Sequence, residues 1–374
     1  MKICYFGTYR KNYSRNKIMI AALESAGVEV IQCNEKLWQG IQDRVDVLTG
    51  GWKKPAFWFR IIKTYSRLMW RMTKIKDFDI LMIGYPGQLD VFLGKLISRL
   101  RKKPLVWDVF MSIHLVAKER NLDQGNTFIL NRIHRLESRA LRIPDLLIQD
   151  TAQYVDWFQQ EYGVQPEKFR LIPTSADDRI FRPIKITRDH HKKQFVVLYY
   201  GTFIPNHGIM KIAQAINHLR DHQDILFECI GDGPDREAFE DYLREHALTN
   251  VRMLDWMRQD ELLKHIAEAD ICLGAFGDTP QSLMTIQNKI YECFAMGKLV
   301  ITGESPATKA SLPEDIIVLC DRDNPEEIAN AIMRLKKQPA LIQKMSENAF
   351  SYFQEHFSIA ILGKRLKQYL AELL

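Results

Sequence analysis

The feature that most constrains this chain is a regular alternation of short apolar runs with longer amphipathic segments. The short runs are rich in Val, Ile and Leu without polar alternation, which is typical of strands buried on both faces of a parallel sheet. The pattern occurs in each half of the chain and therefore predicts two doubly wound α/β domains. The predicted strands are residues 2–7, 28–33, 78–84, 104–108, 144–149 and 169–173, followed by 195–200, 225–230, 250–254, 270–275, 299–302 and 316–320.

The boundary between the two domains is marked by a polar segment, KITRDHHKK at 185–193, after which a strand begins again. We therefore expect an amino-terminal domain over residues 1–186 and a carboxy-terminal domain over residues 194–356. The length of 374 residues agrees with two cores rather than one. The last segment, residues 357–374, has apolar residues at helical spacing, and we expect a helix that can dock back on the first domain.

The net charge of +6 conceals an asymmetry between the two halves. Residues 1–200 hold 34 Lys and Arg against 20 Asp and Glu, whereas residues 201–374 hold 18 against 26. A basic half favours an anionic partner, although solvated surface charge is the simpler alternative. No run reaches the roughly 18 apolar residues of a membrane span, and the amino terminus lacks the apolar core of a signal peptide, so we expect a cytoplasmic protein. Six scattered cysteines predict buried free thiols.

Ligands of open parallel sheets bind at the carboxyl ends of the strands, so the residues after each strand are the candidates. After the first strand, GTYRKNYSRN brings Gly7 and Arg15 to a turn and a helix start, where an anion or a sugar hydroxyl can bind. An ordinary capped loop is an equal alternative. After the fourth strand, Asp108 and then His114 follow. Their alternatives are a helix cap and a structural histidine.

Two glycine-containing loops follow strands of the second half. In GTFIPNHGI, residues 201–209, His207 lies beside a helix start, where a bound diphosphate would hold it protonated. In GDGPD, residues 231–235, the glycines let backbone approach a ligand. Neither loop has the GxGxxG spacing or the GKS/GKT ending, which argues against a dinucleotide enzyme and a P-loop NTPase.

The segment QSLMTIQNKIYECFAMGK, residues 281–298, places a lysine and a glutamate near a helix start. We expect Asn288 as the N-cap and Gly297 as the residue that ends the helix. Lys289 and Glu292 are three residues apart and share one face. A surface ion pair would contribute only about 0.3–0.5 kcal/mol. Alternatively, Lys289 binds a phosphate while Glu292 accepts hydrogen bonds from a ribose diol, which together describe a nucleotide.

The ordered set of these segments resembles the retaining glycosyltransferases of family 4, which are group 1 glycosyltransferases with the GT-B fold. The matching segments are GTYRKNYSRN, YYGTFIPNHGI, IGDGPDREAFEDYL, NVRMLDWMRQDELLKHIAEADICLGAF and QNKIYECFAMGKLVIT. The resemblance covers nearly the whole chain. It implies two Rossmann-like domains facing across a cleft, with a nucleotide-sugar held mostly by the second domain. It also implies hexosyl transfer from a nucleotide-diphosphate-sugar with retention, without a metal ion or further cofactor.

The resemblance also assigns roles to individual residues. It implies that Glu292 binds the nucleotide ribose and that Asn288 and Lys289 contact the donor phosphates. It places Asp108 or His114 near the anomeric centre as the catalytic group. The donor-binding set that we expect is Gly7, Arg15, Thr202, Asn206, His207, Gly231, Gly233, Asp255, Trp256, Met284, Asn288, Lys289 and Glu292.

Three positions depart from the pattern of the family. Thr202 and His207 stand where many members carry an arginine and a lysine, so fewer fixed cations face the diphosphate. Met284 stands where many members carry a glutamate eight residues before the ribose-binding one. We therefore expect sugar recognition in this chain to differ, with Met284 and its neighbours as the place to look.

The expected acceptor is a lipid-linked or cell-surface glycan. Residues 58–76 form an amphipathic helix pattern whose apolar stripe we expect to pack on its own sheet. Its basic side is then available for an anionic membrane, which predicts peripheral attachment to the inner face of the plasma membrane. Two alternatives remain: a nucleotide-sugar epimerase of GT-B fold, and a catalytically impaired nucleotide-sugar-binding protein. A nucleic-acid binder is disfavoured because no recognition motif accompanies the basic charge.

Overall fold

The computed structural model describes residues 1–37, 54–119, 127–185 and 194–374. They form two compact units, Met1–Pro173 together with Ile359–Leu374, and Thr174–Ser358. Each unit contains one six-stranded sheet in which every strand pairing is parallel. The predicted class, two doubly wound α/β sheets, is therefore confirmed, and each of the twelve predicted strands is present.

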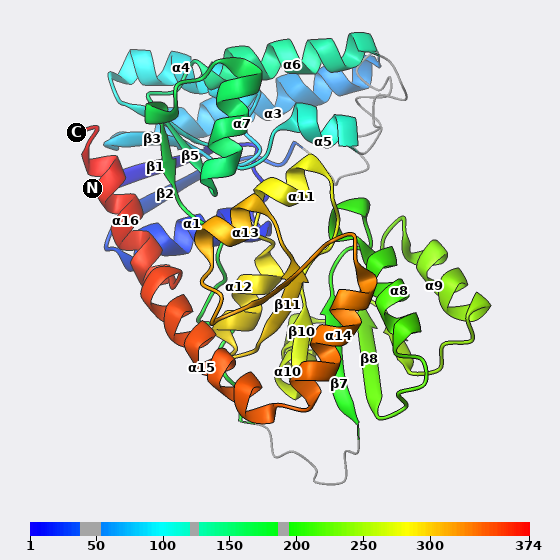
Figure 1. Cartoon of the computed structure of the whole chain (residues 1–374). Coiled ribbons are helices and arrows are strands. Elements are labelled where there is room, and N and C mark those ends of the chain that lie inside the picture. The colour runs from blue at the N-terminus through cyan, green and yellow to red at the C-terminus, as the bar shows by residue number, and fades with distance from the viewer. Residues whose placement is uncertain (38–53, 120–126, 186–193) are drawn as a thin grey trace. The chain divides into compact units, whose positions relative to one another are not determined.

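The first unit has the strand order β2-β1-β3-β4-β5-β6. In Figure 1, α3, α4 and α6 lie together at the top of this unit, while α1 and α16 lie below its sheet. The strands are β1 (Lys2–Gly7), β2 (Glu29–Asn34), β3 (Ile80–Ile83), β4 (Leu105–Asp108), β5 (Leu146–Gln149) and β6 (Phe169–Leu171). The helices are α1 (Ser14–Ser25), α3 (Pro55–Lys74), α4 (Asp90–Arg101), α5 (Ile113–Glu119), α6 (Thr127–Leu141), α7 (Ala152–Tyr162), η2 (Pro166–Lys168) and α16 (Ile359–Ala371).

Helix α16 belongs to the core of the first unit although it comes last in the chain. Leu362, Leu366 and Leu370 are fully buried in one cluster with residues of β1 and α1. A Cβ atom on Gly363 would lie 2.1 Å from the carbonyl oxygen of Ala22. Glycine at this position therefore lets α16 approach the backbone of α1 closely.

The second unit has the strand order β12-β11-β10-β7-β8-β9. The order reverses between β7 and β10, which makes the carboxyl ends of these two strands the topological switch point, where ligands of such sheets bind. The strands are β7 (Phe195–Tyr200), β8 (Ile225–Ile230), β9 (Val251–Leu254), β10 (Ile271–Leu273), β11 (Val300–Gly303) and β12 (Val318–Cys320). The helices are η3 (Pro205–His207), α8 (Ile209–His218), α9 (Arg236–Glu245), α10 (Gln259–Glu268), α11 (Pro280–Met284), α12 (Asn288–Ala295), α13 (Pro306–Ser311), α14 (Pro325–Lys336) and α15 (Pro339–His356).

The division between the units falls at Pro173, earlier than the polar segment suggested. Ala176 and Phe181 are buried in the core of the second unit, so the residues before the polar segment belong there. At the other end, Phe357 stays in the second unit because its ring packs on Tyr291, with 4.9 Å between the ring centroids. Residues 186–193 of the predicted linker lie outside the described residues.

The prediction for the helix within residues 58–76 is wrong in one respect. We expected its apolar stripe to pack on the sheet, but α3 buries only Thr64, Leu68 and Met72. Trp58 and Ile62 of the predicted stripe are 52% and 64% exposed. The helix therefore carries more apolar surface than its contact with the sheet uses. Among the described residues, no helix is long and apolar enough to cross a membrane. All six cysteines are buried and free, as predicted.

Candidate functional site

Lys289 lies at the switch point of the second unit. Its ammonium nitrogen, Nζ, is 3.4 Å from the carbonyl oxygen of Gly274, just after β10, and 4.0 Å from the ring centroid of Tyr199 in β7. A Cβ atom on Gly201, just after β7, would lie 2.7 Å from Nζ. The side chain therefore fills the space between the ends of the two strands, and the missing side chain of Gly201 makes room for it.

The electrostatics of Lys289 are those of a buried cation. Only 5% of the residue is exposed, and burial lowers its pKa to about 7, although Cys293 and Glu292 oppose this effect. A surface ion pair, the alternative considered for this lysine, is thereby excluded. An anionic group arriving next to Nζ would stabilise the charged amine, so the site is suited to a phosphate.

Glu292 lies one turn further along α12 and is half-buried. The hydroxyl of Tyr200 donates to its Oε2 atom at 2.9 Å. Burial raises the pKa of Glu292 to about 7, while the hydrogen bond from Tyr200 and the charge of Lys289 act in the opposite direction. A carboxylate has about four acceptor positions, so an ionised Glu292 can also accept hydrogen bonds from ligand hydroxyls.

The start of α12 differs by one residue from the prediction. Gln287 is the N-cap, Asn288 is the first helical residue, and no side-chain hydrogen bond caps the helix. Gly297 has φ of +65°, the left-handed conformation expected of the residue that follows a helix end. Met284 is half-buried and is the last residue of α11, the short helix that precedes α12.

The loop after β7 is held by its own polar groups. His207 Nδ1 is 2.6 Å from the carbonyl oxygen of Thr202 and 3.2 Å from the hydroxyl of Tyr199. Because a carbonyl can only accept, Nδ1 carries the proton and donates to Thr202. Asn206 donates through Nδ2 to Thr279 Oγ1 at 2.9 Å, so it joins this loop to the cap of α11.

Gly231 and Gly233 bring the loop after β8 against the loop after β7. Their φ angles are +138° and +157°. A Cβ atom on Gly231 would lie 2.0 Å from the carbonyl oxygen of Gly201, and one on Gly233 would lie 2.3 Å from that of Phe203. We expected these glycines to let backbone approach a ligand, whereas the close approach in this structure is to the neighbouring loop.

Asp255 and Trp256 follow β9, and Trp256 is 52% exposed. Arg236, which the sequence reasoning missed, joins Asp255 to the preceding glycine loop. Its Nη1 atom donates to the carbonyl oxygen of Gly231 at 3.1 Å and to Asp255 Oδ1 at 2.5 Å. The sequence signal that could have identified Arg236 is its position at the start of the helix that follows a glycine-containing loop.

Arg322 is a second residue that the sequence reasoning missed. It is 5% exposed, and burial lowers its pKa to about 10. Its guanidinium donates to the carbonyl oxygens of Glu304 at 2.6 Å and Gly303 at 3.0 Å, to that of Gly277, and to Ser282 Oγ at 3.2 Å. Arg322 therefore ties together the loops that follow β10 and β11. It stands two residues after β12, so the rule of reading the residues after each strand would have found it.

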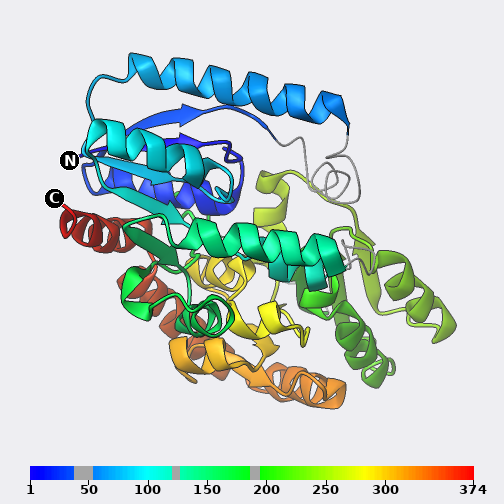
Figure 2. The same ribbon diagram turned by 90° about the horizontal axis from the view of Figure 1, so that it is seen from above.

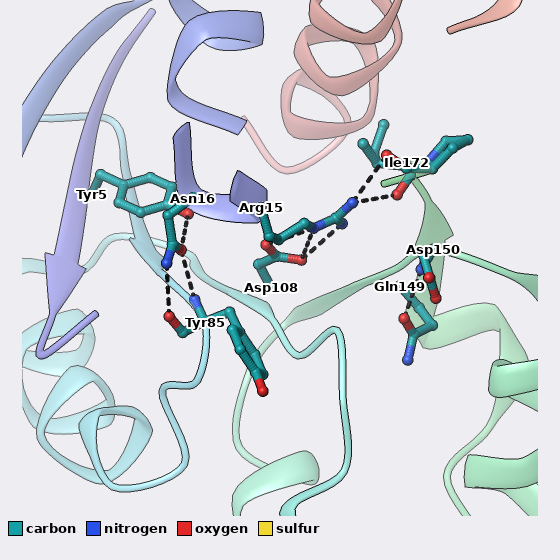
Figure 3. A network of polar contacts seen from close by, with 9 residues as sticks. Tyr5, Arg15, Asn16, Tyr85, Asp108, Gln149, Asp150 and Ile172 are labelled. Atoms are coloured by element: carbon teal, nitrogen blue, oxygen red, sulfur yellow. Dashed lines mark hydrogen bonds and ion pairs between the residues drawn. The ribbon is translucent and has the colours of Figure 1, made fainter. Parts of the chain in front are cut away.

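Arg15 and Asp108 form a buried ion pair in the first unit (Figure 3). Both side chains are fully buried. Arg15 donates to Asp108 from Nε at 3.1 and 3.0 Å and from Nη2 at 2.9 Å, and its Nη1 donates to the carbonyl oxygens of Ile172 and Pro173. Burial raises the pKa of Asp108, and Arg15 counteracts it. Each side chain is bound to the other and has no exposed surface, which favours a structural role for the pair. The catalytic role of Asp108 and the donor-binding role of Arg15 stay predictions.

The turn at Gly7 is likewise filled by the protein itself. Asp90 is fully buried and accepts from the backbone N–H of Thr8 at 2.7 Å, the hydroxyl of Thr8 at 3.0 Å and the hydroxyl of Tyr65 at 2.8 Å. A Cβ atom on Gly7, whose φ is +133°, would lie 2.6 Å from Asp90 Oδ2. Gly7 thus makes room for Asp90, and the donor-binding role predicted for it stays a prediction.

His114 keeps accessible surface at the start of α5 and is half-buried. The buried carboxylate of Glu137 in α6 accepts from the backbone N–H groups of Ile113 at 2.9 Å and His114 at 3.3 Å, and from Ser112 Oγ at 2.5 Å. Glu137 therefore fixes the loop that carries His114. Burial is the main cause that lowers the pKa of His114. Of the two predicted catalytic groups, only His114 is accessible.

The sequence of the chain is similar to those of known glycosyltransferases. Residues 194–338 match the model of the family described as glycosyl transferases group 1. Over 290 residues the chain is 22% identical to an alpha-D-kanosaminyltransferase of Streptomyces kanamyceticus, covering 74% of this chain and 72% of that protein. The family match over residues 194–338 lies within the unit that contains Lys289 and Glu292.

Solved structures share the fold over the whole chain. Sucrose-phosphate synthase from Thermosynechococcus elongatus has a TM-score of 0.75 at 15% identity and covers 100% of this chain and 98% of its own. Anabaena HepE in complex with UDP-glucose has a TM-score of 0.70 at 16% identity and covers 100% of both chains. The chain therefore has the GT-B fold of these glycosyltransferase structures.

Proposed function

We propose that this chain is a retaining glycosyltransferase of family 4 that transfers a hexosyl unit from a nucleotide-diphosphate-sugar. The observation that carries the proposal is the pair formed by Lys289 and Glu292 at the switch point of the second unit. A buried amine with a lowered pKa suits a phosphate, and a carboxylate one helical turn away suits a diol. HepE, which shares the fold, binds UDP-glucose, and this supports the same class of donor here.

The chain's own residues supply the binding groups. Lys289 holds the diphosphate, and the N–H groups at the start of α12 assist it. Glu292 accepts hydrogen bonds from the ribose. Trp256 and Asp255, exposed after β9, flank the base. We propose that these cationic and N–H groups, rather than a metal ion, stabilise the negative charge of the leaving diphosphate. We propose no further cofactor.

The sugar half of the site is assigned to Met284 and the loop after β7. As the bond between C1 and the diphosphate lengthens, positive charge grows at C1 and negative charge grows on the leaving oxygen. Asn206 and His207 position the loop that faces this region, and His114 is the accessible candidate for the group near C1. Retention is tested by NMR of the early product from an α-linked donor: a β-linked product would overturn it.

The acceptor that we propose is a lipid-linked or cell-surface glycan, with the enzyme attached peripherally to the inner face of the plasma membrane. The excess of basic residues in the first half of the chain supports this assignment. An acceptor embedded in a bilayer requires the enzyme to work at that surface.

The donor assignment is tested by thermal-shift screening against UDP-, GDP-, ADP- and dTDP-sugars. We expect one nucleotide class to stabilise the wild-type protein. Glu292→Ala and Lys289→Met should each weaken binding about tenfold or more, because a hydrogen bond to a charged group contributes about 1.5–3 kcal/mol. Lys309→Met is the matched control, since Lys309 is exposed and pairs with the exposed Glu304.

Three results would contradict the proposal. If none of the four classes of nucleotide-sugar stabilises the protein, the assignment of a donor site is wrong. Consumption of the donor into an isomer without any acceptor would indicate an epimerase. Tight binding without transfer to any acceptor would indicate an impaired binding protein.

Met284 offers a separate test of sugar selection. Met284→Glu places a carboxylate where a donor-sugar hydroxyl can be bound, so we expect an altered ratio of kcat/KM between donors that share one nucleotide. Met333→Glu on α14 is the matched control for the added charge. Unchanged preference and unchanged rate would show that Met284 does not contact the sugar.

A further inference from the structure

An apolar groove of about 1260 Å³ opens on the first unit between α3, α4 and α6. Figure 2 shows these three helices side by side, with α4 between α3 and α6. We call this surface the α3–α4–α6 face, formed by Pro55–Lys74, Asp90–Arg101 and Thr127–Leu141. The groove is lined by aromatic and aliphatic side chains of all three helices, among them Trp58, Ile62, Phe92, Leu96, Phe128 and Ile129.

The apolar residues of this face are unusually exposed. Eleven large hydrophobic side chains are exposed in the described part of the chain, and eight of them belong to these three helices. Phe59 and Leu100 are 67% and 71% exposed. A contiguous exposed apolar patch is costly in water and marks a surface that is covered by a partner.

The charge on the same helices has one sign at the surface. The three helices carry eleven Lys and Arg and only two acidic residues. Both acidic residues, Asp90 and Glu137, are fully buried and bound to neighbouring hydroxyl and N–H groups. The face therefore presents cations without exposed carboxylates on its own helices.

Cations and aromatic rings are also in direct contact on this face. Lys74 Nζ lies 3.4 Å from the ring centroid of Trp70, and the guanidinium carbon of Arg132 lies 4.8 Å from that of Phe128. Arg132, Arg135 and Arg139 line one side of the groove. Aromatic side chains beside cations are typical of the boundary between lipid headgroups and acyl chains.

We propose that the α3–α4–α6 face docks on an anionic phospholipid bilayer, with its aromatic and aliphatic side chains inserted below the headgroups and its cations among the phosphates. A second copy of the chain is disfavoured as the occupant, because a two-fold contact would bring like charges together. The inference rests on the peripheral attachment in the proposed function and deepens it by naming the surface that docks, whereas the donor site is independent of it.

Flotation with vesicles tests the proposal on the full chain without donor or acceptor. We expect binding to vesicles of 70% phosphatidylcholine and 30% phosphatidylglycerol and at least tenfold weaker binding to phosphatidylcholine alone, because each cation adds to the attraction of an anionic surface. Raising the salt should weaken the binding. Trp58 and Trp70 should move to a less polar setting, visible as a blue shift of the tryptophan fluorescence.

Two triple variants separate the apolar from the charged contribution. Trp58→Ser/Ile62→Ser/Phe128→Ser and Arg132→Gln/Arg135→Gln/Arg139→Gln should each reduce vesicle binding at least tenfold. The charge-matched control, Arg220→Gln/Arg244→Gln/Arg258→Gln, changes exposed residues of the second unit and should bind as the wild type does.

The outcomes distinguish this inference from the proposed function. Equal binding to neutral and anionic vesicles, or binding unchanged in both triple variants, would overturn the inference while donor-induced thermal stabilisation stays intact. A dimer in solution that the apolar variant converts to a monomer, without lipid binding in either, would assign the face to a second copy. Lipid binding without any donor stabilisation would overturn the proposed function alone.

Discussion

At the residue scale, the lowered pKa of Lys289 makes donor binding dependent on pH. In the free protein the amine loses its proton as the pH rises through about 7. A bound diphosphate favours the charged amine, so its pKa is higher in the complex. Binding therefore takes up a proton above pH 7, and affinity should fall by up to about tenfold per pH unit there.

Glu292 produces the opposite slope on the acidic side. Its pKa of about 7 leaves it protonated at lower pH, whereas ribose hydroxyls donate best to the ionised form. Binding should then release a proton below pH 7, so the affinity has a maximum near neutrality that belongs to the interacting pair. Calorimetry of nucleotide-sugar binding in buffers of different ionisation enthalpy measures both effects. Lys289→Met should abolish only the proton uptake measured at pH 8. An affinity that does not change between pH 6 and pH 9 would contradict the assignment.

A second residue-scale prediction concerns the buried ion pair. Asp108→Ala leaves the Arg15 guanidinium buried without a counter-charge, and we expect the free energy of unfolding to fall by about 3–5 kcal/mol. Urea denaturation measures this loss. Asp255→Ala, which removes an exposed carboxylate, should leave the stability close to that of the wild type.

The double variant Arg15→Met/Asp108→Leu decides between a structural and a catalytic role. Replacing both partners by apolar residues of similar volume removes the unpaired charge, so stability and activity should both recover. If the stability recovers while the activity stays absent, Asp108 has a catalytic role.

At the element scale, the backbone contact between two loops gives a prediction for Gly231. Alanine there must adopt a φ of +138° and place Cβ 2.0 Å from the Gly201 carbonyl oxygen, so we expect a loss of about 2–3 kcal/mol and weaker donor binding. Gly297→Ala is the matched control, because its φ is +65° and nothing lies within 4 Å of the added atom. Its cost should be about 1 kcal/mol. Equal losses in the two variants, measured by denaturation, would show that the loop contact is unimportant.

The elements also show what the sequence can and cannot predict. All twelve strands were predictable, most of them because burial on both faces leaves continuous apolar runs. The edge strands β2 and β9 are only partly buried. The sequence could not predict which apolar side chains of α3 are exposed, because a stripe that packs on a core and a stripe that faces solvent have the same period. Within the site, Lys289 and Glu292 could be recognised because their spacing is local. The pairing of Arg15 with Asp108 joins residues 93 positions apart, and no local pattern reveals such a contact.

At the scale of the whole molecule, the return of the chain to its first unit gives the last prediction. Deleting residues 359–374 removes Leu362, Leu366 and Leu370 from the first core. Hydrogen exchange should then show faster exchange in β1 and α1, with β11 and α12 of the second unit still protected. Deleting only Leu374, which is 66% exposed, is the control. Equal loss of protection in both units would contradict a selective effect.

The position of α16 also orders events during synthesis. Unit Thr174–Ser358 is continuous in the chain, so its core can close as soon as that segment leaves the ribosome. The unit that emerges first must wait, because α16 is translated only after the whole second unit. Until then, the apolar side chains of α1 that α16 covers stay exposed on the nascent chain. The half of the protein that is made first is therefore the half that is completed last, and it has the longer need for protection by chaperones.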